Sequence, residues 1–163
     1  MVSVKHHFEF FRAGASDCVE LLQFYKRCRE PVKFQVSDRI YYLRQSQVLA
    51  DVLANKGTHC FSSTGMIVAA LRIQNDVNLF FLRSLCISPD YRRQGLAGYL
   101  IEQVLMEVKL QPCYCFSYPH LCQLYQAAGF ILADIETAKH RIKDRYQRIK
   151  RTRNIVYMVT SYR

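Results

Sequence analysis

One short stretch decides the fold of this chain: Arg92-Arg93-Gln94-Gly95-Leu96-Ala97. An apolar run at 79–88 precedes it and predicts a strand, and a helical pattern follows from Gly95 to about Lys109. A strand, a short glycine-bearing turn and a helix leave the first N–H groups of that helix without internal partners. Those groups and the helix dipole favour phosphate. The stretch therefore predicts an anion site, and a tight turn without a ligand is the alternative.

Length and composition predict one domain with a substantial core. The chain has 163 residues, 50% of them hydrophobic, with 10 Phe and 11 Tyr. No apolar run reaches the ~18 residues of a membrane span. The N-terminal segment lacks the apolar region of a signal peptide. We therefore expect a cytoplasmic protein whose seven cysteines are reduced and buried. Cys113 and Cys115 are spaced for one face of a strand, so no metal site is expected.

The positive charge of the chain is concentrated near its end. The formal net charge is +10, and the segment Lys139–Arg153 holds eight Lys or Arg against one Asp, a net +7. The pattern predicts a basic amphipathic helix at 137–152, with Ile142, Tyr146 and Ile149 on its apolar face. We interpret the basic side as a solvated face. Nucleic acid, an acidic protein or cofactor phosphates are the alternatives, and nucleic acid is not favoured because interleaved aromatic residues are missing.

The remaining pattern predicts a single α+β domain spanning 1–163. Strands are expected at 8–12, 58–62, 66–74, 79–88, 113–118, 130–133 and 155–160, and helices at 17–29, 38–55, 95–109, 119–128 and 137–152. A strand, helix and strand across 79–118 predict one parallel βαβ unit. The other strands are expected to be antiparallel, which makes a mixed sheet with helices on both faces.

Two interpretations compete for residues 38–55. Ser37 and Asp38 signal a helix start, and the apolar residues that follow have helical spacing. Ile40-Tyr41-Tyr42-Leu43 has strong β-propensity instead, which favours a strand at Arg39–Arg44. We take the helix as the prediction and the strand as the alternative.

Two motifs resemble the GNAT superfamily of N-acetyltransferases. The segment Leu85–Ala97 reads Leu-Cys-Ile-Ser-Pro-Asp-Tyr-Arg-Arg-Gln-Gly-Leu-Ala, similar to the coenzyme A pyrophosphate loop of that family, (Gln/Arg)-x-x-Gly-x-(Gly/Ala). The segment Leu121–Phe130 resembles a later family helix that carries a Tyr and ends in Gly-Phe. Both motifs stand in the family's order, and the resemblance covers residues 58–132. It implies a GNAT-like mixed sheet.

The resemblance implies acetyl-coenzyme A as co-substrate. In the family, backbone amides of the loop bind the pyrophosphate. The corresponding positions are Arg92, Arg93, Gln94, Gly95, Leu96 and Ala97, with Gly98 keeping the approach open. Main-chain groups at Leu85, Cys86 and Ile87 are expected to hold the pantetheine arm and polarise the thioester carbonyl. We expect the Cys86 side chain to be buried, because no His or carboxylate lies at a spacing that would activate it.

The resemblance assigns the general acid to Tyr125, on the helix before Gly129-Phe130. A phenol with a pKa of about 10 stays protonated at neutral pH and can donate to a leaving thiolate. An ordinary core aromatic residue is the alternative. The general base is not assigned, because Arg83 and Ser84 stand where many family members carry an acid. Asp76, Glu9, His59 and Glu20 are candidates that no spacing separates.

The sequence therefore predicts direct transfer of an acetyl group from acetyl-coenzyme A to a primary amine, with both substrates bound together. The acceptor, a small-molecule or peptide amine, is not readable from the residues. We expect a monomer or homodimer. The alternative hypothesis is a non-catalytic GNAT-like module that binds acyl-coenzyme A or RNA, motivated by the missing base.

Overall fold

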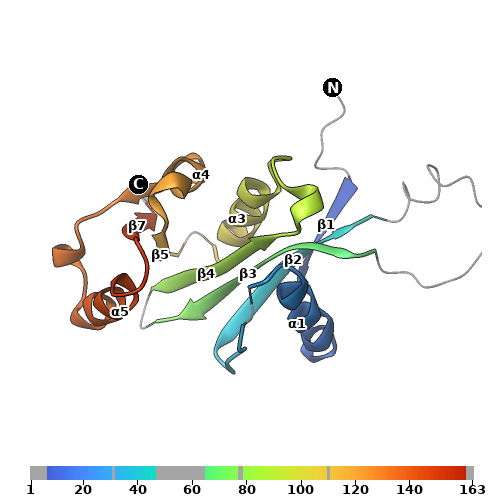
Figure 1. Ribbon diagram of the computed structural model, residues 1–163, viewed down its shortest axis with the longest axis horizontal. Helices are drawn as coiled ribbons and strands as arrows, with labels where there is room; N and C mark the ends of the chain where they lie inside the picture. The colour runs from blue at the N-terminus through green and yellow to red at the C-terminus, as the bar shows by residue number, and fades with distance from the viewer. Residues whose placement is uncertain (1–6, 31, 47–64, 77–78, 110, 161–163) are drawn as a thin grey trace, which may run out of the picture.

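A computed structural model describes residues 7–30, 32–46, 65–76, 79–109 and 111–160. Within these ranges the strands form one mixed sheet in the order β1-β2-β3-β4-β5-β7-β6 (Figure 1). Their bounds are β1 Phe8–Arg12, β2 Asp38–Gln45, β3 Ile67–Asn75, β4 Phe80–Ile87, β5 Cys113–Ser117, β6 Phe130–Leu132 and β7 Val156–Thr160. Strands β4 and β5 are parallel and the other neighbours are antiparallel. The predicted mixed sheet with one βαβ unit is confirmed.

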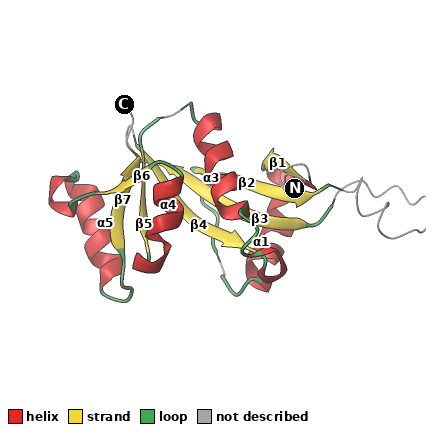
Figure 2. Cartoon of the chain, turned by 90° about the horizontal axis from the view of Figure 1, so that it is seen from above, coloured by secondary structure: helices red, strands yellow, loops and turns green. Residues whose placement is uncertain are grey.

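Helices cover both faces of this sheet. Their bounds are α1 Cys18–Arg27, α3 Leu96–Glu107, α4 Cys122–Ala127 and α5 His140–Lys150, with short 3-10 turns at Ala15–Asp17, Pro89–Tyr91, Pro119–Leu121 and Ile135–Thr137. Helices α3 and α4 lie over one face (Figure 2). On the other face α1 packs on β2, β3 and β4, and α5 packs on β5 and β7. Figure 1 shows α1 and α5 at opposite ends of that face.

The core lies mainly between the sheet and α3. One stripe of this helix is buried, since Leu96, Leu100 and Val104 are at most 3% exposed. Strand β3 is buried on both faces from Ile67 to Ile73, as expected for a strand with helices above and below it. The period of 3.6 in α3 therefore corresponds to one buried face of the helix. The continuous apolar run of β3 corresponds to a strand that is buried on both faces.

The predicted helix at 38–55 is wrong for residues 38–45, which form β2. Its edges pair with β1 and β3, and its side chains are buried on both faces, Tyr41 toward α3 and Tyr42 toward α1. A helix would bury only one stripe. Asp38 does not begin a helix; its carboxylate accepts from the N–H of Gln35 at 2.9 Å and closes a turn. The rest of the predicted helix and the predicted strand at 58–62 lie outside the described residues.

Helix α5 is shorter than predicted and buries the expected residues. Ile142 and Tyr146 are buried, and Ile149 packs beside them, in a cluster that also contains Phe81 and Tyr114. The hydroxyl of Tyr146 donates to the carbonyl of Ile155 at 3.0 Å, which ties α5 to the start of β7. No helix in the described ranges is long and apolar enough to cross a membrane.

Candidate active site

Strands β4 and β5 separate partway along their length, and we call this separation the fork. Their parallel pairing consists of Phe80 with Cys113, Phe81 with Tyr114 and Leu82 with Cys115. Beyond it β5 continues to pair with β7 as far as Ser117, whereas β4 runs on to Ile87 without a strand on its β5 side. A bulge in β4, with Ser84 at φ 54°, accompanies the change of direction. The fork leaves half of β4 with an open edge.

Main-chain groups at the end of β4 point alternately to β3 and to the open edge. The N–H of Ser88 donates to the facing residue of β3 at 2.8 Å. Alternation along an antiparallel ladder then turns the groups of Cys86 toward β3 and those of Leu85 and Ile87 toward the fork. Of the three positions predicted to contact the pantetheine arm, Leu85 and Ile87 therefore present their main chain to the open edge.

The predicted anion-binding stretch is the connection between β4 and α3. Arg93 and Gly95 adopt left-handed backbone conformations, with φ of 61° and 77°, and the second accounts for the glycine. Among the described residues, the N–H groups of 93–98 find no acceptor. A run of free donors at the start of α3 is the arrangement that binds phosphate.

The side chains of this loop do not bind its free backbone N–H groups. The Nε of Arg92 donates to the carbonyl of Ile87 at 3.2 Å, and Gln94 Nε2 donates to the carbonyl of Asp90 at 3.3 Å. Arg93 is exposed. A Cβ built on Gly98 would lie 4.0 Å from the nearest atom of Leu124, so packing alone does not require a glycine there.

Tyr125 projects from α4 into the core beside the fork. It is 6% exposed, and its ring packs edge-on against Phe130 at a centroid distance of 5.7 Å. Burial, with a smaller contribution from the nearby thiol of Cys115, raises the pKa of Tyr125 above its ordinary value. Cys115 is the last β5 residue paired with β4, which places the phenol next to the point of separation. Its hydroxyl donates to no described residue and stays protonated.

Cys86 is buried, as expected. It lies 6% exposed among the residues under α1. Burial and the neighbouring Cys28 raise the pKa of its thiol. A thiol with a raised pKa is a poor nucleophile, because the thiolate is the reactive form.

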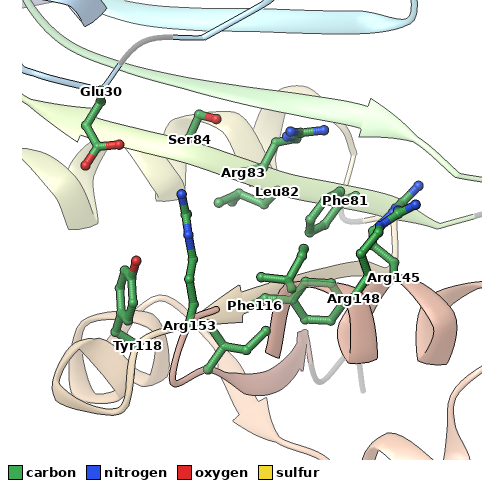
Figure 3. A pocket seen from close by; sticks show the side chains of 12 residues that line it. Glu30, Phe81, Leu82, Arg83, Ser84, Phe116, Tyr118, Arg145, Arg148 and Arg153 are labelled. Atoms are coloured by element: carbon green, nitrogen blue, oxygen red, sulfur yellow. The ribbon is translucent and has the colours of Figure 1, made fainter. Parts of the chain in front are cut away.

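A cavity of about 360 Å³ lies over β4, between α1 and α5 (Figure 3). Apolar side chains that line it come from β4, β5, α5 and the start of β7: Phe81, Leu82, Phe116, Ile149 and Ile155. Ser84, Tyr118 and four arginines add polar groups, and Glu30, just after α1, adds a carboxylate. The cavity opens beside the same fork as Tyr125, from the opposite face of the sheet.

The structure shows where three of the four candidate bases lie. Asp76 is buried and paired with arginines of α5, and Glu20 makes a bidentate ion pair with Arg44 at 2.8 and 2.6 Å. Glu9 lies on the edge strand β1, three strands from β4, and His59 is outside the described residues. None of the three described candidates lines the cavity.

Glu30 is the residue that sequence reasoning missed. It is exposed, and of the described carboxylates it is the one that lines the cavity (Figure 3). In the sequence it marks only the end of the first helix, before Pro31. No spacing could have identified it, because α1 and β4 meet only when the sheet forms.

The fold and the sequence both match known acetyltransferases. Residues 34–146 match the family model described as acetyltransferase (GNAT) domain. Similar solved structures include the ribosomal-protein-S18-alanine N-acetyltransferase from Escherichia coli, at 13% identity and a TM-score of 0.60 over 94% of this chain and 92% of that one. Escherichia coli ElaA matches at 16% identity and a TM-score of 0.61, with 94% and 98% covered.

A third similar structure is N-acetylglutamate synthase from Neisseria gonorrhoeae, complexed with coenzyme A and N-acetyl-glutamate. It matches at 10% identity and a TM-score of 0.66, over 94% of this chain and 34% of that one. No curated protein sequence matches significantly. Identities this low show a shared fold alone, whereas the family model covers well over half of the chain. The chain therefore belongs to the GNAT acetyltransferase family.

Proposed function

We propose that this protein transfers the acetyl group of acetyl-coenzyme A directly to a primary amine, with both substrates bound together. The observation that carries the proposal is the continuous arrangement of free loop amides, the open edge of β4 and Tyr125 around one fork. The N–H groups of residues 93–98 bind the pyrophosphate. Main-chain groups of Leu85 and Ile87 align the pantetheine arm, and a free N–H there stabilises charge on the thioester oxygen.

Two side chains move protons in this proposal. Glu30 takes a proton from the incoming ammonium, directly or through water, so that the amine nitrogen can attack the acetyl carbon. As the C–N bond forms and the C–S bond breaks, Tyr125 gives its proton to the departing thiolate, and the second proton lost by the nitrogen passes through water to restore the phenol. The raised pKa of Tyr125 keeps that proton available at neutral pH. The two residues lie on opposite faces of the sheet, one on each side of the fork.

Calorimetric titration with acetyl-coenzyme A tests the donor site. We expect binding, and we expect Gly95→Val to weaken it roughly tenfold, because the left-handed backbone costs a side chain about 1–2 kcal/mol and shifts the loop amides. Gly129→Val is the matched control, since Gly129 has φ 90° and equally open space but follows α4. Absence of detectable binding by the unaltered protein at millimolar ligand would sink the proposal.

Glu30→Gln tests the base. Near neutral pH we expect kcat/KM to fall about tenfold, because an exposed carboxylate shares its task with water. The loss should shrink as the pH rises and the free amine becomes abundant. Glu107→Gln, at the exposed end of α3, is the control. A pH–rate profile identical to that of the unaltered enzyme would show that Glu30 takes no proton.

Thiol release measured across amines, polyamines, amino acids, peptides and aminoglycosides separates catalysis from binding alone. Turnover on any of these acceptors supports the transferase. Binding of acetyl-coenzyme A without turnover on any acceptor supports the alternative, a module that holds acyl-coenzyme A.

A further inference from the structure

We propose that the acceptor amine carries an anionic group, a carboxylate or a phosphate, and that Arg148 and Arg153 bind it in the cavity. The inference rests on the proposed acetyl transfer, because it names the class of amine that the cavity admits. It is carried by the charges around the cavity, because three of its arginines have no ion-pair partner among the described residues.

Four arginines line the cavity against one carboxylate, Glu30. One of the four, Arg145, is already neutralised, because its Nη1 donates to Asp76 at 2.7 Å. For Arg83, Arg148 and Arg153, no carboxylate of the described residues lies within ion-pair distance. The cavity therefore has an excess of positive charge that the described part of the chain does not balance.

Arg83 shows what this excess costs. Its guanidinium is half-buried on β4 and lies over the ring of Phe81, and among the described residues its hydrogen-bond acceptor is the neutral Oε1 of Gln74, at 3.5 Å. Burial lowers the pKa of Arg83, and the like charges of Arg72 and Arg145 lower it further. A guanidinium nevertheless stays protonated in proteins. A partly buried cation without a counter-charge is unfavourable, so an anionic ligand is stabilised here.

The negative charge of Glu30 and the positive charge of Arg148 lie at different ends of the cavity. Figure 3 shows Glu30 at one side and Arg148 at the other, with Arg153 rising between them from the segment that joins α5 to β7. An amine directed toward Glu30 thus leaves room for an acidic group near the two guanidinium groups. The planar fork of donors on arginine suits carboxylate and phosphate oxygens.

These arginines are on the acceptor side, not on the coenzyme A phosphate side. The cavity is lined by β4 residues Phe81 to Ser84, whereas the loop with the free amides begins after Ile87. Ile87 lies three positions after Ser84 along the strand, a distance of about 10 Å. Arg148 and Arg153 are exposed, as predicted for a solvated basic face, and this part of the face also lines the cavity.

Matched pairs of acceptors test the inference: β-alanine with β-alaninamide, γ-aminobutyrate with its amide, and phosphoethanolamine with ethanolamine, so that the second member of each pair has no anionic group. We expect the anionic member of at least one pair to have a kcat/KM tenfold or more above its neutral partner. The first two pairs test a carboxylate and the third tests a phosphate. For the preferred acceptor KM should rise with salt, because screening weakens the attraction.

Variants locate the effect. Arg148→Gln and Arg153→Gln are each expected to raise KM for the anionic acceptor about tenfold, with a smaller change in kcat and none in KM for its neutral partner. Arg151→Gln removes the same charge from an exposed residue outside the cavity and should change KM less than twofold. Acetylated acceptors titrated by calorimetry give a second readout that needs no turnover.

The inference is overturned by the absence of a preference for an anionic member in both turnover and binding. It is also overturned by an equal effect of Arg151→Gln and Arg153→Gln. A large RNA affinity lost in all three variants would favour a nucleic-acid surface instead and would also overturn it. Failure of acetyl-coenzyme A itself to bind contradicts the proposed function and is distinguishable, because that titration contains no acceptor.

Discussion

Replacing Tyr125 with Phe is expected to lower kcat by roughly 10²–10⁴-fold, the usual contribution of a positioned general acid. The substitution removes one hydroxyl whose pKa is raised and which donates to no described residue. The departing thiolate would then have to take its proton from water. Steady-state kinetics with saturating acetyl-coenzyme A measures the loss, and calorimetry should show unchanged affinity, because the phenol acts after the donor is bound.

A matched control for this experiment is available in the same fold. Tyr157 is also 6% exposed, makes no side-chain hydrogen bond to a described residue and lies on β7, outside the cavity. Tyr157→Phe should keep full kcat. Neither variant should lower the melting temperature appreciably, since no hydrogen bond to the described protein is lost.

The pH dependence gives an independent check. The pKa of Tyr125 is raised, so its protonated form persists above the ordinary pKa of about 10. The unaltered enzyme should therefore show no decline in kcat between roughly pH 8 and 10 that depends on Tyr125. Full kcat in Tyr125→Phe, or the same loss in Tyr157→Phe, would remove Tyr125 from the role of acid.

The geometry of the loop before α3 and the place of Tyr125 on α4 could be predicted from the sequence, because they depend on local features. The loop amides of residues 93–98 are free as a consequence of a strand, a turn and a helix in succession, and Gly95 has the positive φ that its identity suggests. Tyr125 lies one helical turn before Gly129, so its position near the end of a helix could also be predicted from neighbouring residues. Periodicity and turn chemistry suffice for such features.

For segment 38–45 the sequence left a helix and a strand as alternatives, and the cavity over β4 was not predicted, because both depend on long-range contacts. Tyr41 and Tyr42 are buried on opposite faces only because β1 and β3 pair with both edges of β2. Glu30 and Arg153 line one cavity although most of the chain lies between them. Nothing in the local sequence around Glu30 or Arg153 distinguishes a residue that lines a cavity from one on the solvated surface.

The basic helix illustrates the same limit. Its apolar positions Ile142 and Tyr146 were predictable from spacing, and they are buried. The division of its charges was not, because it depends on Asp76, which lies in the turn after β3. Arg141 and Arg145 pair with that carboxylate, whereas Arg148 lines the cavity and has no ion-pair partner in the described part of the chain.

Removing the carboxylate of Asp76 should destabilise the protein by about 3–5 kcal/mol, the usual cost of breaking a buried ion pair. Asp76 is 5% exposed, and its Oδ2 accepts from Tyr114 Oη at 2.6 Å and from Arg145 Nη1 at 2.7 Å. Arg141 Nε lies 3.3 Å from Oδ1. Asp76→Ala leaves the Tyr114 hydroxyl and the Arg145 guanidinium without their acceptor, so we expect thermal unfolding roughly 6–20 °C lower.

Variants at this carboxylate also decide between a structural role and the role of base. Asp76→Asn keeps an acceptor for Tyr114 but loses the charge, so its destabilisation should be smaller. Asp76→Ala combined with Arg145→Met removes both charges and should recover part of the loss, since an unpaired buried cation costs more than an apolar replacement. If Asp76 were the base, Asp76→Asn would change the pH–rate profile with little effect on stability. Its two arginine partners and its burial indicate the opposite: Asp76 holds α5 against β4 and β5, and Arg148 is thereby kept at the cavity.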